Sequence, residues 1–82
     1  MRVAEGVIAK AVGEELLLLD AKRGIYQGLD SVGARVWQLL TGGTSLDETL
    51  SVLFDEYEVS RDQLRQDVEQ LLEELRRDGL LL

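Results

Sequence analysis

Cysteine, histidine and proline are all absent from this sequence of 82 residues. Without cysteine there can be no disulfide, no thiolate nucleophile and no metal site built on sulfur. Without histidine the chain lacks the usual general base near neutral pH and the usual transition-metal ligand. Catalysis would have to rest on carboxylates, lysine, tyrosine or hydroxyl groups. We therefore expect a protein that is not an enzyme and that uses no metal and no cofactor.

Long apolar runs and basic clusters are missing as well. No run reaches the ~18 apolar residues that a membrane-spanning helix needs, and the first residues lack the layout of a secretory signal. We therefore expect a cytoplasmic protein. The net charge is −7, from 16 acidic and 9 basic residues. A nucleic-acid binder needs a basic face, and an acidic surface repels DNA and anionic lipid. The expected partners thus include neither nucleic acid nor membrane.

The first 30 residues carry the signals of a small β-sheet. Short β-favouring stretches between turn residues predict three strands, one within residues 3–12 and the others over 15–20 and 25–29. The apolar run at 15–20 fits either a strand covered on both faces or a piece of helix. Its shortness and its flanking turns favour a strand. Consecutive strands joined by tight turns predict an antiparallel meander with the third strand at an edge.

Residues 31–82 are typical of three helices. The predicted N-caps are Asp30 or Ser31, Ser45 and Ser60. Gly42-Gly43 ends the first helix and Gly79 ends the third. Apolar residues at helical spacing give each helix an inward stripe, made of Val32, Val36, Leu39 and Leu40, then Leu46, Leu50, Leu53, Phe54 and Tyr57, then Leu64, Val68, Leu71, Leu72 and Leu75. An apolar tail at residues 80–82 is expected to pack back onto the domain.

This order of elements predicts one domain over residues 1–82, with a three-stranded sheet in 1–30 and three helices in 31–82. The fold class is α+β, of the winged helix-turn-helix type. The hydrophobic share of the chain, 45%, is enough for a core.

The third strand, residues 25–29, is the candidate site. Natural proteins usually protect a strand edge with proline, charge or a bulge. Residues 24–29 contain neither proline nor charge, although Lys22 and Arg23 precede them. An open, neutral edge fits the capture of a peptide as an added strand. The alternative is that the segment is simply short, with Gly24 and Gly28 serving turns or bulges.

The last helix offers a second wall to this site. At ~100° per residue, Leu64, Val68, Leu71 and Leu75 share one stripe. Asp67, Glu74 and Asp78 border that stripe beside Leu71. The stripe can be read as ordinary core with solvated flanks. Alternatively, the margin near Leu71 and Asp67 lines a groove with an apolar floor and an acidic lip, which would accept an extended peptide with hydrophobic anchors and a basic residue.

Four short motifs occur in order between residues 29 and 81. Residues 29–37 (LDSVGARVW) fit L-N-x-x-G/A-x-x-I/V-W with Asp30 in place of asparagine, and residues 40–44 (LTGGT) fit L-x-G-x-T/S. Residues 57–59 (YEV) fit Y-x-V, and residues 67–81 (DVEQLLEELRRDGLL) fit D-V-x-x-F/L-L-x-x-L-x-x-x-G-L-L. In this order and spacing they resemble the PqqD-like family, also described as RiPP recognition elements.

The resemblance implies a leader-peptide binder. Residues 18–26 lack the Y-P-E-G stretch of the pyrroloquinoline-quinone branch and look more like the stand-alone elements of lasso-peptide pathways. In this family the leader of a ribosomally made precursor lies antiparallel to the third strand, against the third helix. The peptide-binding residues would then be Arg23, Gly24, Ile25, Tyr26, Gln27, Gly28, Leu29, Leu64, Asp67, Val68, Leu71 and Glu74. The implied further partners are a leader peptidase and an ATP-dependent macrolactam synthetase.

Three other functions remain open at this point. One is a winged-helix DNA-binding regulator, against which the acidic charge argues. Another is a PqqD-type chaperone that serves a radical enzyme. A third is a structural subunit that dimerises through its apolar edge.

Overall fold

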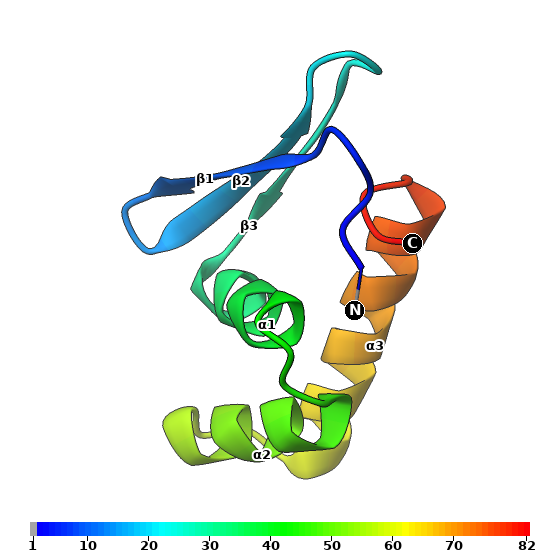
Figure 1. The fold of residues 1–82 in the computed structure, drawn as a ribbon. Coiled ribbons are helices and arrows are strands. Elements are labelled where there is room, and N and C mark those ends of the chain that lie inside the picture. Colours follow the sequence, from blue (N-terminus) through cyan, green and yellow to red (C-terminus); the bar gives the residue numbers. More distant parts are fainter. Residues whose placement is uncertain (1) are drawn as a thin grey trace.

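The computed structural model describes residues 2–82 and consists of three strands followed by three helices (Figure 1). The elements are β1 (Ile8–Val12), β2 (Glu15–Asp20), β3 (Ile25–Leu29), α1 (Ser31–Thr41), α2 (Leu46–Glu56) and α3 (Arg61–Arg77). The strands form one antiparallel sheet in the order β1-β2-β3. The predicted α+β meander is confirmed, and β3 lies at an edge.

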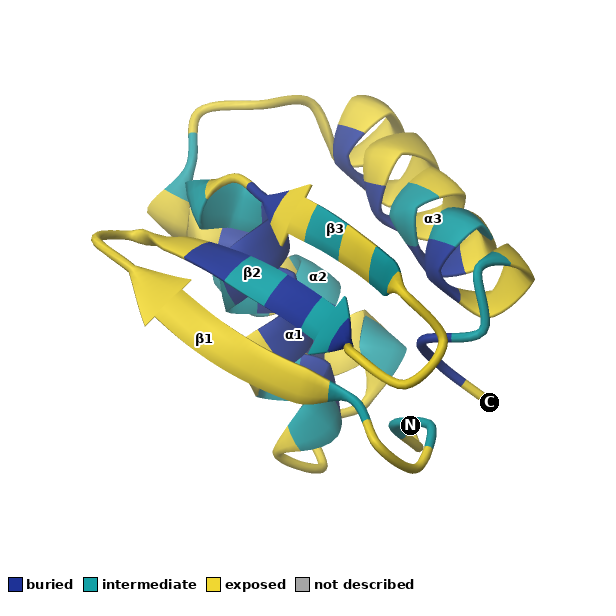
Figure 2. Cartoon of the chain, turned by 90° about the horizontal axis from the view of Figure 1, so that it is seen from above, coloured by how far each residue is buried: buried dark blue, intermediate teal, exposed yellow. Residues whose placement is uncertain are grey.

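The pairing register decides which side chains face the helices. Leu16 and Leu18 of β2 are opposite Leu29 and Gln27 of β3, and because cross-strand partners share a face, these four point the same way. Leu16, Leu18 and Leu29 are buried. The intervening leucines of β2 are only half-buried and every residue of β1 is exposed (Figure 2). The sheet is therefore covered on one face, so the prediction of a strand covered on both faces is wrong for β2.

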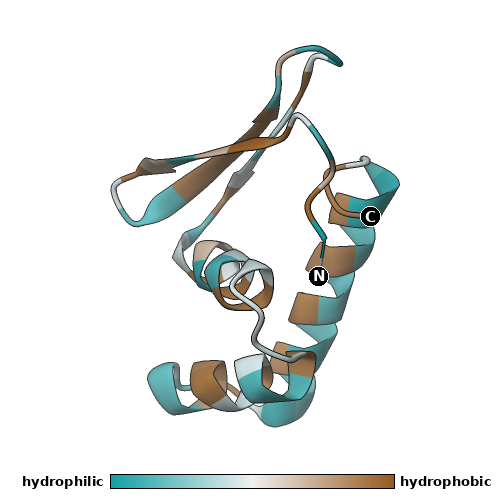
Figure 3. Cartoon of the chain, viewed as in Figure 1, coloured by the Kyte–Doolittle hydropathy of each residue, from teal (hydrophilic) through white to brown (hydrophobic). Residues whose placement is uncertain are grey.

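The core fills the space between the inner face of the sheet and the three helices. Its buried residues are Leu16, Leu18, Leu29, Ala34, Val36, Trp37, Leu40, Leu53, Leu64, Val68, Leu72, Leu75, Leu80 and Leu81. Figure 3 shows the hydrophobic turns of α3 on the side nearest α1, with hydrophilic residues on its outer side. Within residues 2–82, no helix has the length and apolar character required to cross a membrane.

The helix ends follow the predicted caps. Asp30 caps α1 by accepting a hydrogen bond from the Gly33 N–H at 2.8 Å. The hydroxyls of Ser45 and Ser60 cap α2 and α3 by accepting from Glu48 N–H and Gln63 N–H, each at 3.1 Å. These bonds satisfy backbone donors that have no partner inside the helix. The cap at Asp30 also fixes the point where the chain leaves β3 and enters α1.

The C-terminal tail packs back as expected, except at its last residue. Leu80 and Leu81 are buried, whereas Leu82 is 67% exposed. Leu81 pairs with Val3 in an isolated antiparallel bridge, and the Ala4 N–H donates to the Leu80 carbonyl at 3.1 Å. Residues 3 and 4 therefore hold the segment that follows α3 in place through backbone hydrogen bonds.

A polar latch joins the turn between β2 and β3 to the end of α3. The buried carboxylate of Asp20 accepts from Arg23 Nε at 2.6 Å and from the Arg23 backbone N–H at 3.2 Å. The same guanidinium donates to the Gly79 carbonyl at 2.7 Å. The hydrogen bond from the Arg23 side chain, followed by the one from its backbone, lowers the pKa of Asp20 below its ordinary value of 3.8. The latch holds the β2–β3 hairpin beside the C-terminal end of α3.

We predict that Gly79→Ala destabilises the protein more than Gly13→Ala does. Both glycines have positive φ, +76° and +63°, so alanine costs about 1–2 kcal/mol at each in backbone strain. A Cβ at Gly13 meets nothing within 4 Å, but one at Gly79 would stand 2.5 Å from an Arg23 guanidinium nitrogen. The Arg23 guanidinium must then shift, which strains its hydrogen bond to the Gly79 carbonyl. Urea unfolding of both variants measures the difference, and equal losses would show that the latch contributes nothing.

The lowered pKa of Asp20 predicts a dependence of stability on pH. A carboxyl whose pKa is lower in the folded state stabilises the fold above its unfolded pKa, and this contribution is lost as pH falls through the folded value. Asp20→Asn should therefore be less stable than the wild type at pH 7. The gap in the free energy of unfolding should shrink below about pH 4. Unfolding curves of both proteins from pH 7 down to pH 3 measure this, and a gap independent of pH would contradict it.

Candidate functional site

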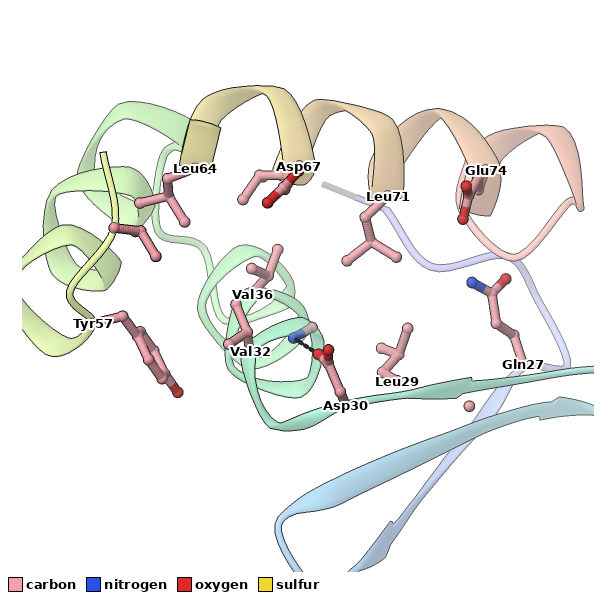
Figure 4. A pocket seen from close by; sticks show the side chains of 14 residues that line it. Gln27, Leu29, Asp30, Val32, Val36, Tyr57, Leu64, Asp67, Leu71 and Glu74 are labelled. Carbon is pink, nitrogen blue, oxygen red and sulfur yellow. Dashed lines mark hydrogen bonds between the residues drawn. The ribbon is translucent and has the colours of Figure 1, made fainter. Parts of the chain in front are cut away.

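A cleft of about 440 Å³ lies between the free edge of β3 and α3 (Figure 4). In Figure 2, α3 runs beside β3 on the side away from β2. The residues that line the cleft come from β3, α1, the α2–α3 connection and α3. They are Gln27, Gly28, Leu29, Asp30, Val32, Gly33, Val36, Tyr57, Val59, Leu64, Asp67, Val68, Leu71 and Glu74.

The centre of the cleft is apolar. Leu71 points from α3 toward Leu29 of β3, and Val32 of α1 lies to one side of them, toward Tyr57 (Figure 4). Gly33 keeps this centre open, because a Cβ built there would stand 3.3 Å from Leu29 Cβ and 3.5 Å from a Leu71 methyl carbon. Leu71 is only half-buried, whereas the neighbouring Leu72 is buried. The exposed part of Leu71 is thus available to an apolar side chain.

Three carboxylates stand around this apolar centre. Asp30 is held by its cap to Gly33, Asp67 accepts from Gln63 Nε2 at 2.8 Å, and Glu74 accepts from Gln70 Nε2 at 3.5 Å. None of the three forms an ion pair with the described residues. The acidic lip expected from the sequence is therefore present on α3, and Asp30 adds to it from the opposite wall.

The backbone of β3 has hydrogen-bonding groups that point into this cleft. Bonded and non-bonded residue pairs alternate along an antiparallel ladder, and the two-residue turn makes Val12 and Glu15 a bonded pair. From that pair the alternation continues along β2, so that Leu16, Leu18 and Asp20 exchange backbone hydrogen bonds with β3. Their partners in β3 are Leu29, Gln27 and Ile25. We therefore expect the N–H and C=O of Tyr26 and Gly28 to face away from β2, toward α3.

The structure brings eight of the twelve sequence-predicted residues to the cleft: Gln27, Gly28, Leu29, Leu64, Asp67, Val68, Leu71 and Glu74. Four lie outside its lining. Arg23 belongs to the latch and Gly24 to the preceding turn, with φ of +69°. The Ile25 side chain packs against the core. Tyr26 is 74% exposed on the outer face of the sheet, because it alternates with the inward Gln27.

Sequence reasoning missed six lining residues: Asp30, Val32, Gly33, Val36, Tyr57 and Val59. The first four follow β3 directly along the chain or lie one helical turn later. The sequence predicts Asp30 as a cap and Val32 and Val36 as part of the core stripe of α1, while Gly33 occurs only in the first of the quoted motifs. The helical pattern does not show which side of α1 faces a cleft. Tyr57 and Val59 are the conserved letters of the Y-x-V motif quoted above, which was the signal available for them.

This arrangement is suited to binding an extended chain. Within residues 2–82 no three acidic side chains are grouped so that they could hold a metal ion. The cleft combines an unpaired row of backbone groups with an apolar floor and an acidic rim. An extended chain can form hydrogen bonds with the backbone groups and place apolar side chains on the floor.

Comparisons with known proteins bear on this cleft. The family model for coenzyme PQQ synthesis protein D (PqqD) matches residues 15–81. TbiB1 in complex with the TbiA(beta) leader peptide is 33% identical with a TM-score of 0.89, covering 99% of this chain and 94% of that chain. Lasso peptide synthetase B1 complexed with the leader peptide is 28% identical with a TM-score of 0.91, covering 99% and 95%. Comparison with curated proteins gives no match.

Proposed function

This chain belongs to the PqqD family, and we propose that it binds the leader peptide of a ribosomally synthesised precursor, of the lasso-peptide type, as a fourth strand on β3. The observation that carries this proposal is that β3 is an edge strand whose residues 27–29 line an apolar cleft closed by α3. Gly28 has no side chain and lines the cleft with its backbone. Both similar structures named above are leader-peptide complexes.

The leader would bind through two kinds of contact. Backbone hydrogen bonds to β3 give affinity that is independent of the leader's sequence, and side-chain pockets give specificity. Ordering a flexible peptide costs about 2–5 kcal/mol, so buried anchors must contribute most of the net affinity. The space between Leu29, Val32 and Leu71 is the pocket we assign to such an anchor.

We further propose that the domain delivers the precursor to separate enzymes, a leader peptidase and an ATP-dependent macrolactam synthetase. A bound leader keeps the attached core peptide close to whichever enzyme the domain contacts. This raises the effective concentration of the substrate without any catalytic group in the domain itself.

The experiment that tests the function is selection of binders from a random peptide library. Tyr26→Pro should weaken binding of these peptides by about tenfold or more, because it removes one edge donor and leaves a peptide carbonyl unpaired. Ala11→Pro is the matched control, because Ala11 is exposed on β1, at the other edge of the sheet. Ala11 and Leu16 form a non-bonded pair next to the bonded pair Val12 and Glu15, so the Ala11 N–H faces away from β2. Calorimetry measures both, and equal affinities would overturn the edge site.

Leu71→Asp should lower the affinity for the same peptides by about 2–3 kcal/mol, since it puts a charge into the pocket of the anchor. Leu17→Asp is its control, because Leu17 is also half-buried but lies on the outer face of the sheet. Circular dichroism establishes that both variants are folded. A loss of affinity in Leu17→Asp as large as in Leu71→Asp would show that the effect is not local to the cleft.

A further inference from the structure

The outer face of the sheet carries apolar side chains that no element within residues 2–82 covers. The pairing register places Ile8 of β1, Leu19 of β2 and Tyr26 of β3 in one row across the strands. Ile8 is 60% exposed and Tyr26 is 74% exposed, while Leu19 and the neighbouring Leu17 are half-buried. In Figure 2 this face is turned toward the viewer, with α1 and α2 behind it. A continuous exposed apolar surface of this kind is typical of a contact with another protein.

The charges of the chain are divided unequally between its two halves. Residues 1–29 contain four acidic and four basic residues, so the half that forms the sheet has no net charge. Residues 30–82 contain twelve acidic and five basic residues and carry the whole net charge of −7. The outer face itself has one lysine and one glutamate, Lys10 and Glu15. It is therefore the surface through which two copies of this acidic chain can approach with the least electrostatic repulsion.

The side chains of the outer face are also complementary to themselves. A two-fold rotation about an axis along β2 places β1 of one copy over β3 of the other. Ile8 then meets Tyr26 of the second copy, and the outward leucines of β2 meet their own counterparts. Lys10 lies over Gly28, where a Cβ would meet nothing within 4 Å, so its aliphatic stem has room. Contacts in which the same patch is used by both copies are the commonest in homodimers.

We propose that two copies of this protein associate through the outer faces of their sheets, about a two-fold axis along β2. The two sheets then pack as the layers of a sandwich, about 10 Å apart. Each sheet has three strands of about five residues, which gives a flat footprint of roughly 240 Å². Stable complexes bury about 800 Å² on each partner. The dimer is therefore weak and reversible, and it is populated at high protein concentration.

This contact leaves the cleft free. The cleft is lined by Gln27 and Leu29, whose side chains point to the opposite face of β3 from Tyr26. The edge of β3 stays open beside α3 when the outer face is covered. The dimer can thus hold one peptide in each copy, and association and peptide binding should be independent of each other.

Sedimentation velocity of the full chain, from about 10 μM to about 1 mM, tests the dimer in the range where a weak contact becomes populated. We expect the mean sedimentation coefficient to rise with concentration toward that of a dimer. Ile8→Glu should weaken association at least tenfold, because it places an unpaired charge in the apolar row. Leu82→Glu makes the same change of charge at another exposed apolar residue, 67% exposed, and should have no effect.

A second variant tests the two-fold axis without a loss of apolar contact. The axis brings the Glu15 side chains of the two copies together at the rim of the contact. Glu15→Gln should therefore strengthen association about threefold, since it removes a repulsion between exposed like charges. Glu73→Gln makes the same change in net charge at an exposed position on α3 and should leave association unchanged. Equal association in these two variants would overturn the arrangement about β2.

The remaining outcomes separate the dimer from the proposed function. Ile8→Glu should keep the affinity of the wild type for the selected peptides while it loses association. A single monomeric species up to about 1 mM would overturn the dimer and leave the outer face to a different protein. Equal losses of association in Ile8→Glu and Leu82→Glu would overturn it as well. Failure of all selected peptides to respond to Tyr26→Pro would instead count against the cleft alone.

Discussion

An α-helix uses its backbone hydrogen-bonding groups internally, and this constraint explains the cleft. The middle of α3 can offer only side chains to the neighbouring β3 edge. The helix therefore shields the edge of the sheet without completing it. The N–H and C=O groups expected to point outward from Tyr26 and Gly28 remain without backbone partners, in a space whose walls are partly apolar. A protein that placed another strand there would have no cleft, and one that left out α3 would expose an unprotected edge.

The width of the cleft depends on how α3 is held. On its core side, Leu64, Val68 and Leu75 are buried among the other helices and fix the helix laterally. At its C-terminal end, the Arg23 guanidinium ties the Gly79 carbonyl to the β2–β3 turn. Between these points α1 forms the floor, and the absence of a side chain at Gly33 leaves room for Leu29 and Leu71 beside it. Fold stability and site geometry therefore share the same few contacts.

The elements could be predicted from local signals because local physics decides them. The bounds of β3, the caps at Ser45 and Ser60 and the glycine at position 79 all depend on residues close in sequence. The members of the cleft depend instead on which margin of a helix meets which strand. Asp30 was recognised as a cap, but its place on the wall opposite α3 could be known only once the helices were packed. The alternation of β3 directs the Tyr26 side chain outward, so the part of Tyr26 expected to take part in the site is its backbone.

Gln27 has a consequence for the alignment of any chain that adds to β3. Backbone pairing alone is degenerate, because a strand can slide by two residues and recover the same pattern of bonds and the same facing of its side chains. Each such slip moves the added chain by about 6.8 Å along the sheet. An apolar floor tolerates the slip wherever the chain offers a second hydrophobic residue. Gln27 is polar and lines the cleft beside Leu29, so each register places a different residue of the added chain opposite it.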